Sequence, residues 1–197
     1  MIIVSGPSTV GKNPFIYEAC KLYDLDFWVP YTTRAMRCEE SHGKDYFFLP
    51  KLEFQSKILE GEIKEWDYCL NNYYGYSYVP LGRDKVITHG LSRLALRIKD
   101  KYPQDITTIF LMPCDMNKIF NNLKEIYKGK DLLLREMLVE EEICHSKLFD
   151  SILMVTDSVR DLLEREETKQ IILSGMEKNL LSIRRSCTEK AKEKIFI

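Results

Sequence analysis

The sequence predicts an α/β fold in which helices cover both faces of a parallel sheet. Residues 1–5 are a short apolar run that leads into a glycine-rich loop and then a helical stretch. Two later runs, 106–113 and 151–157, are apolar and β-branched without alternation, as expected of central strands buried on both faces. Helical segments at about 115–127, 132–147 and 158–173 lie between and after them. This order predicts a doubly wound parallel sheet.

Composition and charge restrict the class of protein. A chain of 197 residues can form one α/β domain with a small appendage, and its net charge of −1 gives no general reason to bind nucleic acid. No apolar run approaches 18 residues, and "MIIVSG" lacks the basic start and cleavage site of a signal peptide, so we expect no membrane association. The six cysteines are scattered without a CxxC pair, which argues against zinc and disulfides and favours the cytoplasm.

The glycine-rich loop has the spacing of a phosphate-binding P-loop. Gly6 and Gly11 are separated by four residues, and Lys12 follows directly at the start of a predicted helix that runs to about Tyr23. Such a loop directs several backbone N–H groups at one point, where the helix dipole also favours an anion, and its lysine reaches the β- and γ-phosphates. We therefore predict an ATP-binding loop made of Gly6, Pro7, Ser8, Thr9, Val10, Gly11, Lys12 and Asn13.

Asn13 occupies the position at which a P-loop normally has Ser or Thr. That hydroxyl ligates Mg²⁺, and an amide oxygen is a neutral, longer ligand, so Asn13 is predicted as a weak metal ligand. Pro14 is compatible with the helix because the N–H that it lacks has no partner in a first turn.

A second motif lies in residues 31–49, "YTTRAMRCEESHGKDYFFL". Arg34 and Arg37 are three residues apart, near Glu40 and Tyr46. Two guanidinium groups and a phenol suit a dianionic phosphate, and Glu40 can hold one arginine in place. On composition alone, an ordinary solvated loop explains this stretch as well.

A third motif is "EWDYCLNNYYGYSY", residues 65–78, within a segment from 28 to 80 that holds most of the tyrosines and both tryptophans. Short strand-like pieces predict a small, mostly β insertion beside the parallel sheet. Glu65 is either a carboxylate at the rim of this insertion or an acceptor for two N–H groups of a purine edge.

Taken together and in order, "GPSTVGKN", "TTRAMRCEESHGKDYFF", "GEIKEWDYCLNNYYGYS" and "KYPQDITTIFLMP" closely resemble the guanylate kinase family over about residues 1–163. The resemblance implies the reaction of ATP with GMP to give ADP and GDP, with Mg²⁺. It also implies a core P-loop domain (1–30 and 81–163, with a helical lid at about 115–140) and a GMP-binding-like β domain (31–80).

By position, the resemblance assigns catalytic roles to Lys12, Arg34 and Arg135. The residues that it assigns to the nucleoside monophosphate are Arg34, Arg37, Glu40, Tyr46, Glu65, Tyr74, Tyr76 and Ser77. Glu65 would read the N1 and N2 edge of guanine, and Arg34, Arg37, Tyr46 and Tyr74 would hold the acceptor phosphate.

The chain also departs from the family pattern. Pro30 and Tyr76 replace two serines, residues 82–90 lack the family's aspartate, and Glu140 replaces the arginine that would pair with Arg135. Two hypotheses stay open: a nucleoside monophosphate kinase with weakened selection of guanine, or a non-catalytic module of this fold that binds a phosphorylated ligand. The retained Lys12 favours the kinase.

Residues 164–197 are predicted as a charged, helical C-terminal extension. Its apolar positions at helical spacing indicate a packed terminal helix or an oligomer contact, such as that of a homodimer. These positions are Met176, Leu180, Ile183 and Cys187.

Overall fold

A computed structural model describes residues 1–81, 83, 85–155 and 158–177. Its main sheet has five parallel strands in the order β2-β7-β1-β8-β9, which confirms the predicted fold class. In chain order these strands are β1 (Ile2–Ser5), β2 (Asp26–Phe27), β7 (Val86–His89), β8 (Thr107–Pro113) and β9 (Ser151–Val155).

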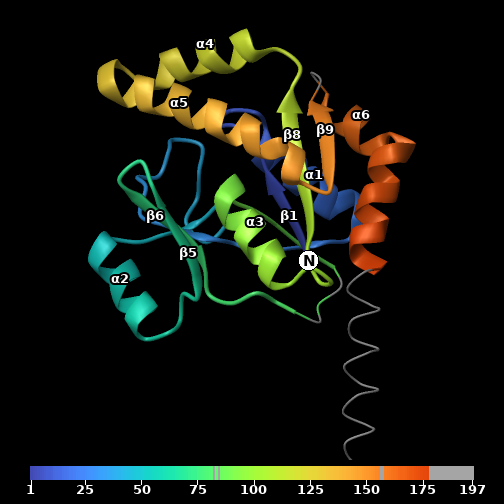
Figure 1. Cartoon of the computed structure of the whole chain (residues 1–197), viewed down its shortest axis with the longest axis horizontal. Helices are drawn as coiled ribbons and strands as arrows, with labels where there is room; N and C mark the ends of the chain where they lie inside the picture. The colour runs from blue at the N-terminus through green and yellow to red at the C-terminus, as the bar shows by residue number, and fades with distance from the viewer. Residues whose placement is uncertain (82, 84, 156–157, 178–197) are drawn as a thin grey trace, which may run out of the picture.

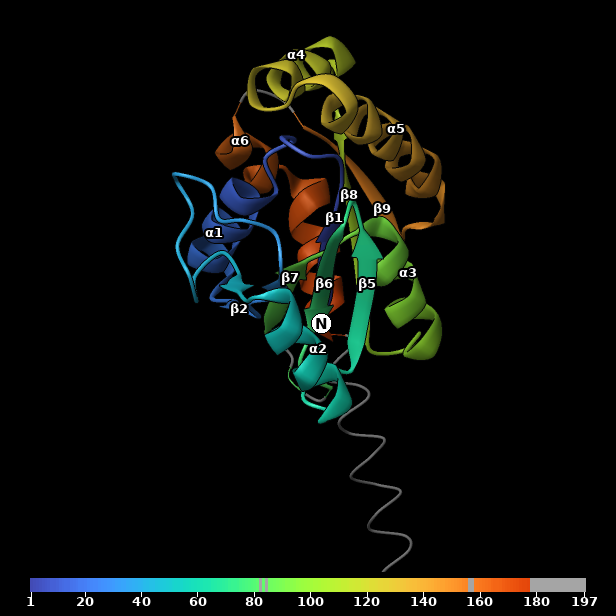
Figure 2. The ribbon, with the colours of Figure 1, turned by 90° about the vertical axis from the view of Figure 1, so that its left-hand side faces the viewer.

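Helices cover both faces of this sheet (Figures 1 and 2). In the central strand β1, Ile2 and Val4 belong to one apolar cluster with α1 (Lys12–Tyr23) and α6 (Val159–Glu164). Ile3 belongs to a second cluster, with α3 (Ser92–Lys101). The strand alternates between two buried faces, which explains its continuous apolar sequence.

A smaller sheet stands beside the main one, in the order β4-β3-β6-β5. It consists of β3 (Tyr31–Thr32), β4 (Phe47–Phe48), β5 (Glu65–Cys69) and β6 (Asn72–Tyr76). The segment also contains a helix that we did not predict, α2 (Lys51–Leu59), whose Phe54 is buried and stacks on Tyr73. The main domain likewise contains α3, which was absent from our prediction although Leu94, Ala95 and Ile98 form an apolar face.

Helices α4 (Met116–Ile126) and α5 (Gly129–His145) form a hairpin over the carboxyl ends of the strands (Figure 1). The side chain of Asp115 caps α4 by accepting from the N–H of Asn117. A short 3₁₀ turn (Ser146–Leu148) leads from α5 towards β9. None of the helices in the described ranges is long and apolar enough to cross a bilayer.

After α6, residues 166–177 are also helical. Met176 packs against the first apolar cluster, the one that contains residues of α1 and α6. This agrees with a packed helix for the first part of the predicted extension. Leu180, Ile183 and Cys187 lie outside the described residues.

Tyr76 connects the two sheets. Although it lies in β6, its ring is 2% exposed and packs with Ile3, Val86 and α3 in the second apolar cluster. Its hydroxyl donates to the carbonyl oxygen of His89 over 2.7 Å. Gly90 makes room for that hydroxyl, because a Cβ there would approach it closely. Tyr76 therefore belongs to the core that joins the small sheet to the large one.

Replacing Tyr76 tests this placement. Tyr76→Phe removes only one buried hydrogen bond and is expected to lower the free energy of unfolding by about 1 kcal/mol. Tyr76→Ser also leaves a cavity, and about 3 kcal/mol or more is expected. Urea denaturation measures both, with Tyr78→Ser, a half-exposed ring two residues along, as the control. Equal small losses in all three variants would contradict a core role.

Candidate active site

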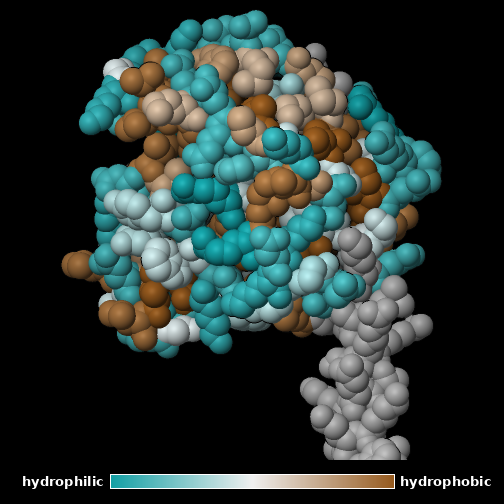
Figure 3. Space-filling view, in the orientation of Figure 1, coloured by the Kyte–Doolittle hydropathy of each residue, from teal (hydrophilic) through white to brown (hydrophobic). Residues whose placement is uncertain are grey.

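One cavity of about 450 Å³ lies between the P-loop, the arginine-containing loop after β3 and the helix α5. In the space-filling view the molecule is notched between the tip of the α4–α5 hairpin and the small sheet (Figure 3). Eleven of the residues that the sequence nominated line the cavity: Ser8, Thr9, Gly11, Lys12, Asn13, Arg34, Arg37, Glu40, Tyr46, Tyr74 and Arg135. Segments far apart in the sequence thus supply one polar chamber.

The P-loop lies at the carboxyl end of the central strand β1. Gly6 and Gly11 have backbone φ values of 145° and 98°, which residues with a side chain rarely adopt. A Cβ atom on Gly6 would also lie 2.6 Å from the carbonyl oxygen of Leu111. Lys12 turns back over the loop, and its Nζ donates to the carbonyl oxygens of Gly6 (2.5 Å) and Pro7 (2.8 Å). Burial lowers the pKa of Lys12, and the carboxylate of Glu142 opposes that shift.

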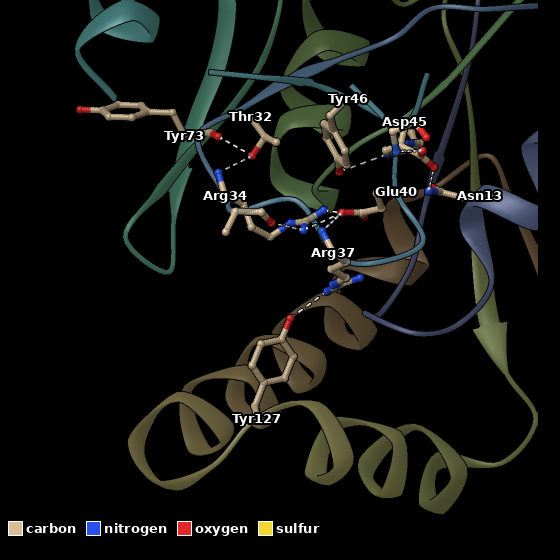
Figure 4. A network of polar contacts seen from close by, with 12 residues as sticks. Asn13, Thr32, Arg34, Arg37, Glu40, Asp45, Tyr46, Tyr73 and Tyr127 are labelled. Carbon is tan, nitrogen blue, oxygen red and sulfur yellow. Dashed lines mark hydrogen bonds and ion pairs between the residues drawn. The ribbon is translucent and has the colours of Figure 1, made fainter. Parts of the chain in front are cut away.

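Asp45 joins the P-loop helix to the arginine-containing loop (Figure 4). Its Oδ1 accepts from Asn13 Nδ2 (2.8 Å) and from the hydroxyl of Tyr17 (2.6 Å), and its Oδ2 accepts from the backbone N–H of Ser41 (2.8 Å). Burial and this bond to Asp45 raise the pKa of Tyr17, so the phenol keeps its proton. The unusual Asn13 is therefore a structural partner of Asp45.

Arg34 and Glu40 form a partly buried ion pair with two hydrogen bonds. Arg34 Nη1 and Nη2 donate to the two carboxylate oxygens over 2.9 and 2.7 Å, and the backbone N–H of Arg37 donates to Glu40 as well (2.9 Å). Burial alone would raise the pKa of Glu40, but the bonds from Arg34 and Arg37 bring it below its ordinary value. The Arg34 guanidinium also lies 5.5 Å from the ring centre of Tyr46. This loop is thus ordered by its own charges.

Tyr127 holds two further arginines at the side of the α4–α5 hairpin. Its hydroxyl accepts from Arg37 Nη2 over 2.8 Å (Figure 4), and the Arg135 guanidinium lies 4.4 Å from its ring centre. Tyr127 follows α4, so one neutral side chain joins the arginine-containing loop to the helical hairpin. Sequence reasoning missed it, because a single tyrosine after a helix carries no pattern.

Two buried titratable groups in the cavity wall were also missed. Glu142, on α5, is 4% exposed; burial raises its pKa to about 7, although Lys12 and the Ser92 N–H favour the carboxylate. His89, at the end of β7, is 1% exposed, and burial together with Lys12 lowers its pKa to about 3. Both residues stand in ordinary helix and strand sequences, so only the tertiary structure reveals them.

The remaining nominated residues lie elsewhere. Gly6, Pro7 and Val10 belong to the loop but do not line the cavity, and neither do Glu65, Tyr76 and Ser77. Glu65 pairs with Tyr76 across β5 and β6, and its Oε1 accepts from Lys101 Nζ over 2.5 Å. The carboxylate predicted to read guanine is held by a lysine, and the tyrosine beside it is in the core.

Comparison with known proteins identifies relatives over most of the chain. A family model described as guanylate kinase matches residues 1–87. The guanylate kinase of Streptococcus thermophilus is 31% identical over 94% of this chain and 95% of its own length. That of Streptococcus agalactiae is 35% identical over 87% and 85%. The crystal structure of guanylate kinase from Anaplasma phagocytophilum superposes with a TM-score of 0.69 at 22% identity, covering 89% of this chain and 86% of that one, which shows the shared fold.

The raised pKa of Glu142 predicts a pH-dependent contribution to stability. A carboxyl with an unfolded pKa of 4.5 and a folded pKa of about 7 stabilises the fold fully below pH 4.5, and this contribution is lost as pH rises through 7. Glu142→Gln does not titrate and can still accept from Ser92. Relative to the parent, its free energy of unfolding should rise by about 2 kcal/mol between pH 5 and pH 8.

Urea denaturation at both pH values measures this change, with Glu140→Gln, an exposed position on the same helix, as the control. A difference between parent and Glu142→Gln that is the same at pH 5 and pH 8 would show that Glu142 ionises normally.

Proposed function

The chain belongs to the guanylate kinase family, and on this premise we propose that it transfers the γ-phosphoryl group of ATP to the phosphate of a nucleoside monophosphate. One observation carries the proposal: Lys12 and the P-loop share a single cavity with Arg34, Arg37 and Arg135. A donor site and an acceptor site for phosphate are therefore adjacent. Residues 31–80 would supply the acceptor domain, 1–30 and 81–163 the core, and 115–140 the lid.

On the donor side, the loop N–H groups and the positive end of α1 suit the β- and γ-phosphates. The Lys12 ammonium now bonds to carbonyl oxygens of its own loop, and phosphate oxygens would compete for it. Thr9 belongs to the cavity wall, and its buried Oγ1 has no hydrogen-bond partner within the described residues; a bound phosphate would supply one.

Magnesium fits as a companion of ATP. Within the described ranges no group of three or more His, Cys, Asp or Glu side chains could hold a metal ion. Mg²⁺ is commonly held by few protein ligands and by substrate phosphates. With Nδ2 of Asn13 bonded to Asp45, its Oδ1 is the atom that would complete such a site. The ion would neutralise charge on the phosphates.

On the acceptor side, Arg34, Arg37, Tyr46 and Tyr74 line the same cavity and would together bind the acceptor phosphate. An oxygen of the acceptor phosphate attacks the γ-phosphorus, a new P–O bond forms, and the bond to the β–γ bridging oxygen breaks. ADP departs with the bonding electron pair. Arg135 and Lys12, which line the same cavity, would stabilise the charge on the transferring group, which is the main catalytic demand of such a reaction.

The family suggests GMP as the acceptor, but the side chains expected to select the guanine base make other contacts in this protein. Glu65 is bonded to Lys101, and Tyr76 is buried. A site that has no free hydrogen-bond partners for the base discriminates poorly between bases. We therefore propose GMP as an acceptor with reduced selectivity. Location in the cytoplasm and dimerisation stay predictions from the sequence.

The donor site is tested by Lys12→Ala. Loss of charge-assisted bonds to phosphate is expected to weaken ATP binding by about tenfold or more, measured by calorimetry. Lys21→Ala, an exposed lysine on the same helix, is the control and should bind ATP as the parent does. Equal affinities in all three proteins would refute the P-loop assignment.

The acceptor is tested by a panel of GMP, dGMP, IMP, AMP, CMP and UMP with Mg·ATP, following ADP release. IMP lacks the 2-amino group of GMP. Because Lys101 holds Glu65 away from that group, we expect GMP and IMP to react at rates within about tenfold of each other.

The double variant Arg34→Ala with Arg37→Ala should abolish turnover. Arg160→Ala, which changes an exposed residue of α6, should not. Strong turnover of GMP, with no turnover of the other acceptors, would contradict the reduced selectivity. No turnover across the panel, with ATP still bound, would favour a binding module instead.

A further inference from the structure

His89 ends β7 at the carboxyl edge of the main sheet, directly beside the P-loop. Strand pairing aligns it with Val4 of β1, two residues before Gly6. Its backbone carbonyl oxygen accepts from Tyr76, which fixes the main chain, and its side chain lines the cavity. The imidazole is therefore a built part of the cavity wall.

The plane of the ring is held from two sides. Phe27 stacks on it with ring centres 5.5 Å apart, and Tyr46 approaches edge-on at 4.9 Å. The Tyr46 hydroxyl lies 3.3 Å from Nδ1. The other nitrogen, Nε2, is buried and has no hydrogen-bond partner within the described residues. A buried polar atom without a partner is costly, so it requires an explanation. A ligand in the cavity supplies one.

Burial, reinforced by nearby cations, lowers the pKa of His89 and keeps the ring neutral. Burial lowers the pKa of His89 most, Lys12 and Arg34 lower it further, and Asp45, through its charge and its backbone, opposes them. Burial also raises the pKa of Tyr46, so its phenol remains protonated and can donate to Nδ1. A neutral imidazole that accepts at Nδ1 carries its proton on Nε2. In the tautomer in which the Tyr46 phenol donates to Nδ1, Nε2 is a donor, and its complement in a cavity lined by four cationic side chains is an anion.

We propose that the Nε2–H of His89 donates a hydrogen bond to the phosphate of the acceptor, which makes His89 a further binding residue of the proposed kinase site. Its contact with Tyr46, and through Tyr46 with the Arg34 guanidinium, places it on the acceptor side of the cavity. The chamber already holds Lys12, Arg34, Arg37 and Arg135. A neutral donor adds a bond to phosphate without adding repulsion among these cations while the site is empty.

The proposal rests on the proposed function for its ligand, and binding tests it without turnover. His89→Leu removes the donor, whereas His89→Gln keeps an N–H donor near the position of Nε2. Calorimetry with GMP should show binding weakened about tenfold or more in the leucine variant and within about threefold of the parent in the glutamine variant. Guanosine, which lacks the phosphate, should bind all three proteins equally.

His145→Leu is the matched control, because that half-buried histidine bonds Ser92 outside the cavity. Nitrogen-15 NMR of the parent, titrated with GMP and separately with inorganic phosphate, should report a protonated Nε2 whose signal moves on binding. Equal losses in His89→Leu and His89→Gln, or no movement of the Nε2 signal with either probe, would overturn the proposal. Phosphate-dependent binding that needs His89, in a protein silent across the acceptor panel, would overturn the kinase function and leave this inference standing.

Discussion

The carboxylate of Asp45 is the contact on which the geometry of the cavity depends. It is 6% exposed and accepts hydrogen bonds from two side chains of α1 and from the backbone of the arginine-containing loop. An unpaired buried carboxylate would be strongly unfavourable, so these three donors and Asp45 fix one another. The consequence is a fixed distance between the P-loop helix and the loop that presents Arg34. Phosphoryl transfer requires this, because most of its catalysis is positioning.

Charge balance is the second constraint on the site. Four cationic side chains face one cavity, and two of them, Arg34 and Lys12, lie near carboxylates, those of Glu40 and Glu142. The remaining two both contact Tyr127: its hydroxyl oxygen accepts a hydrogen bond from Arg37, and the guanidinium of Arg135 lies over its ring. The three arginines are thus held in place before any anion arrives, whereas burial lowers the pKa of Lys12 and leaves it in need of an anion. An incoming phosphate does not have to gather these side chains, which reduces the entropy cost of binding.

The parts of the structure that were predictable from sequence have local signals. The P-loop has a fixed glycine spacing, β1 and β8 are continuous apolar runs, and α1 begins at Lys12 as expected. Arg34 and Arg37 could be nominated because two guanidinium groups near a carboxylate have few alternative uses. In contrast, α2 and α3 were missed, since α2 lies in an aromatic segment that favoured strands and α3 follows directly on β7.

The groups that sequence could not nominate are those whose role arises from burial. Asp45, His89 and Glu142 are ordinary polar residues in the chain, and each becomes distinctive only when the folded chain buries it. No spacing rule records that an imidazole is held between two aromatic rings, or that a carboxyl group on a helix lies near a lysine. Perturbed ionisation of this kind is a property of the tertiary environment.

Tyr76 shows how one substitution can change recognition and architecture together. At that position the family pattern has a serine, and a serine could neither fill the space between β6 and α3 nor reach the carbonyl of His89. The tyrosine does both, and it thereby couples the small sheet to the strand end that carries the imidazole. In the proposed kinase, selection of a base and stability of the domain contact would therefore depend on the same position. In the proposed kinase, a return to serine would offer the base a polar group only by opening the core, so the two properties could not be improved independently at this position.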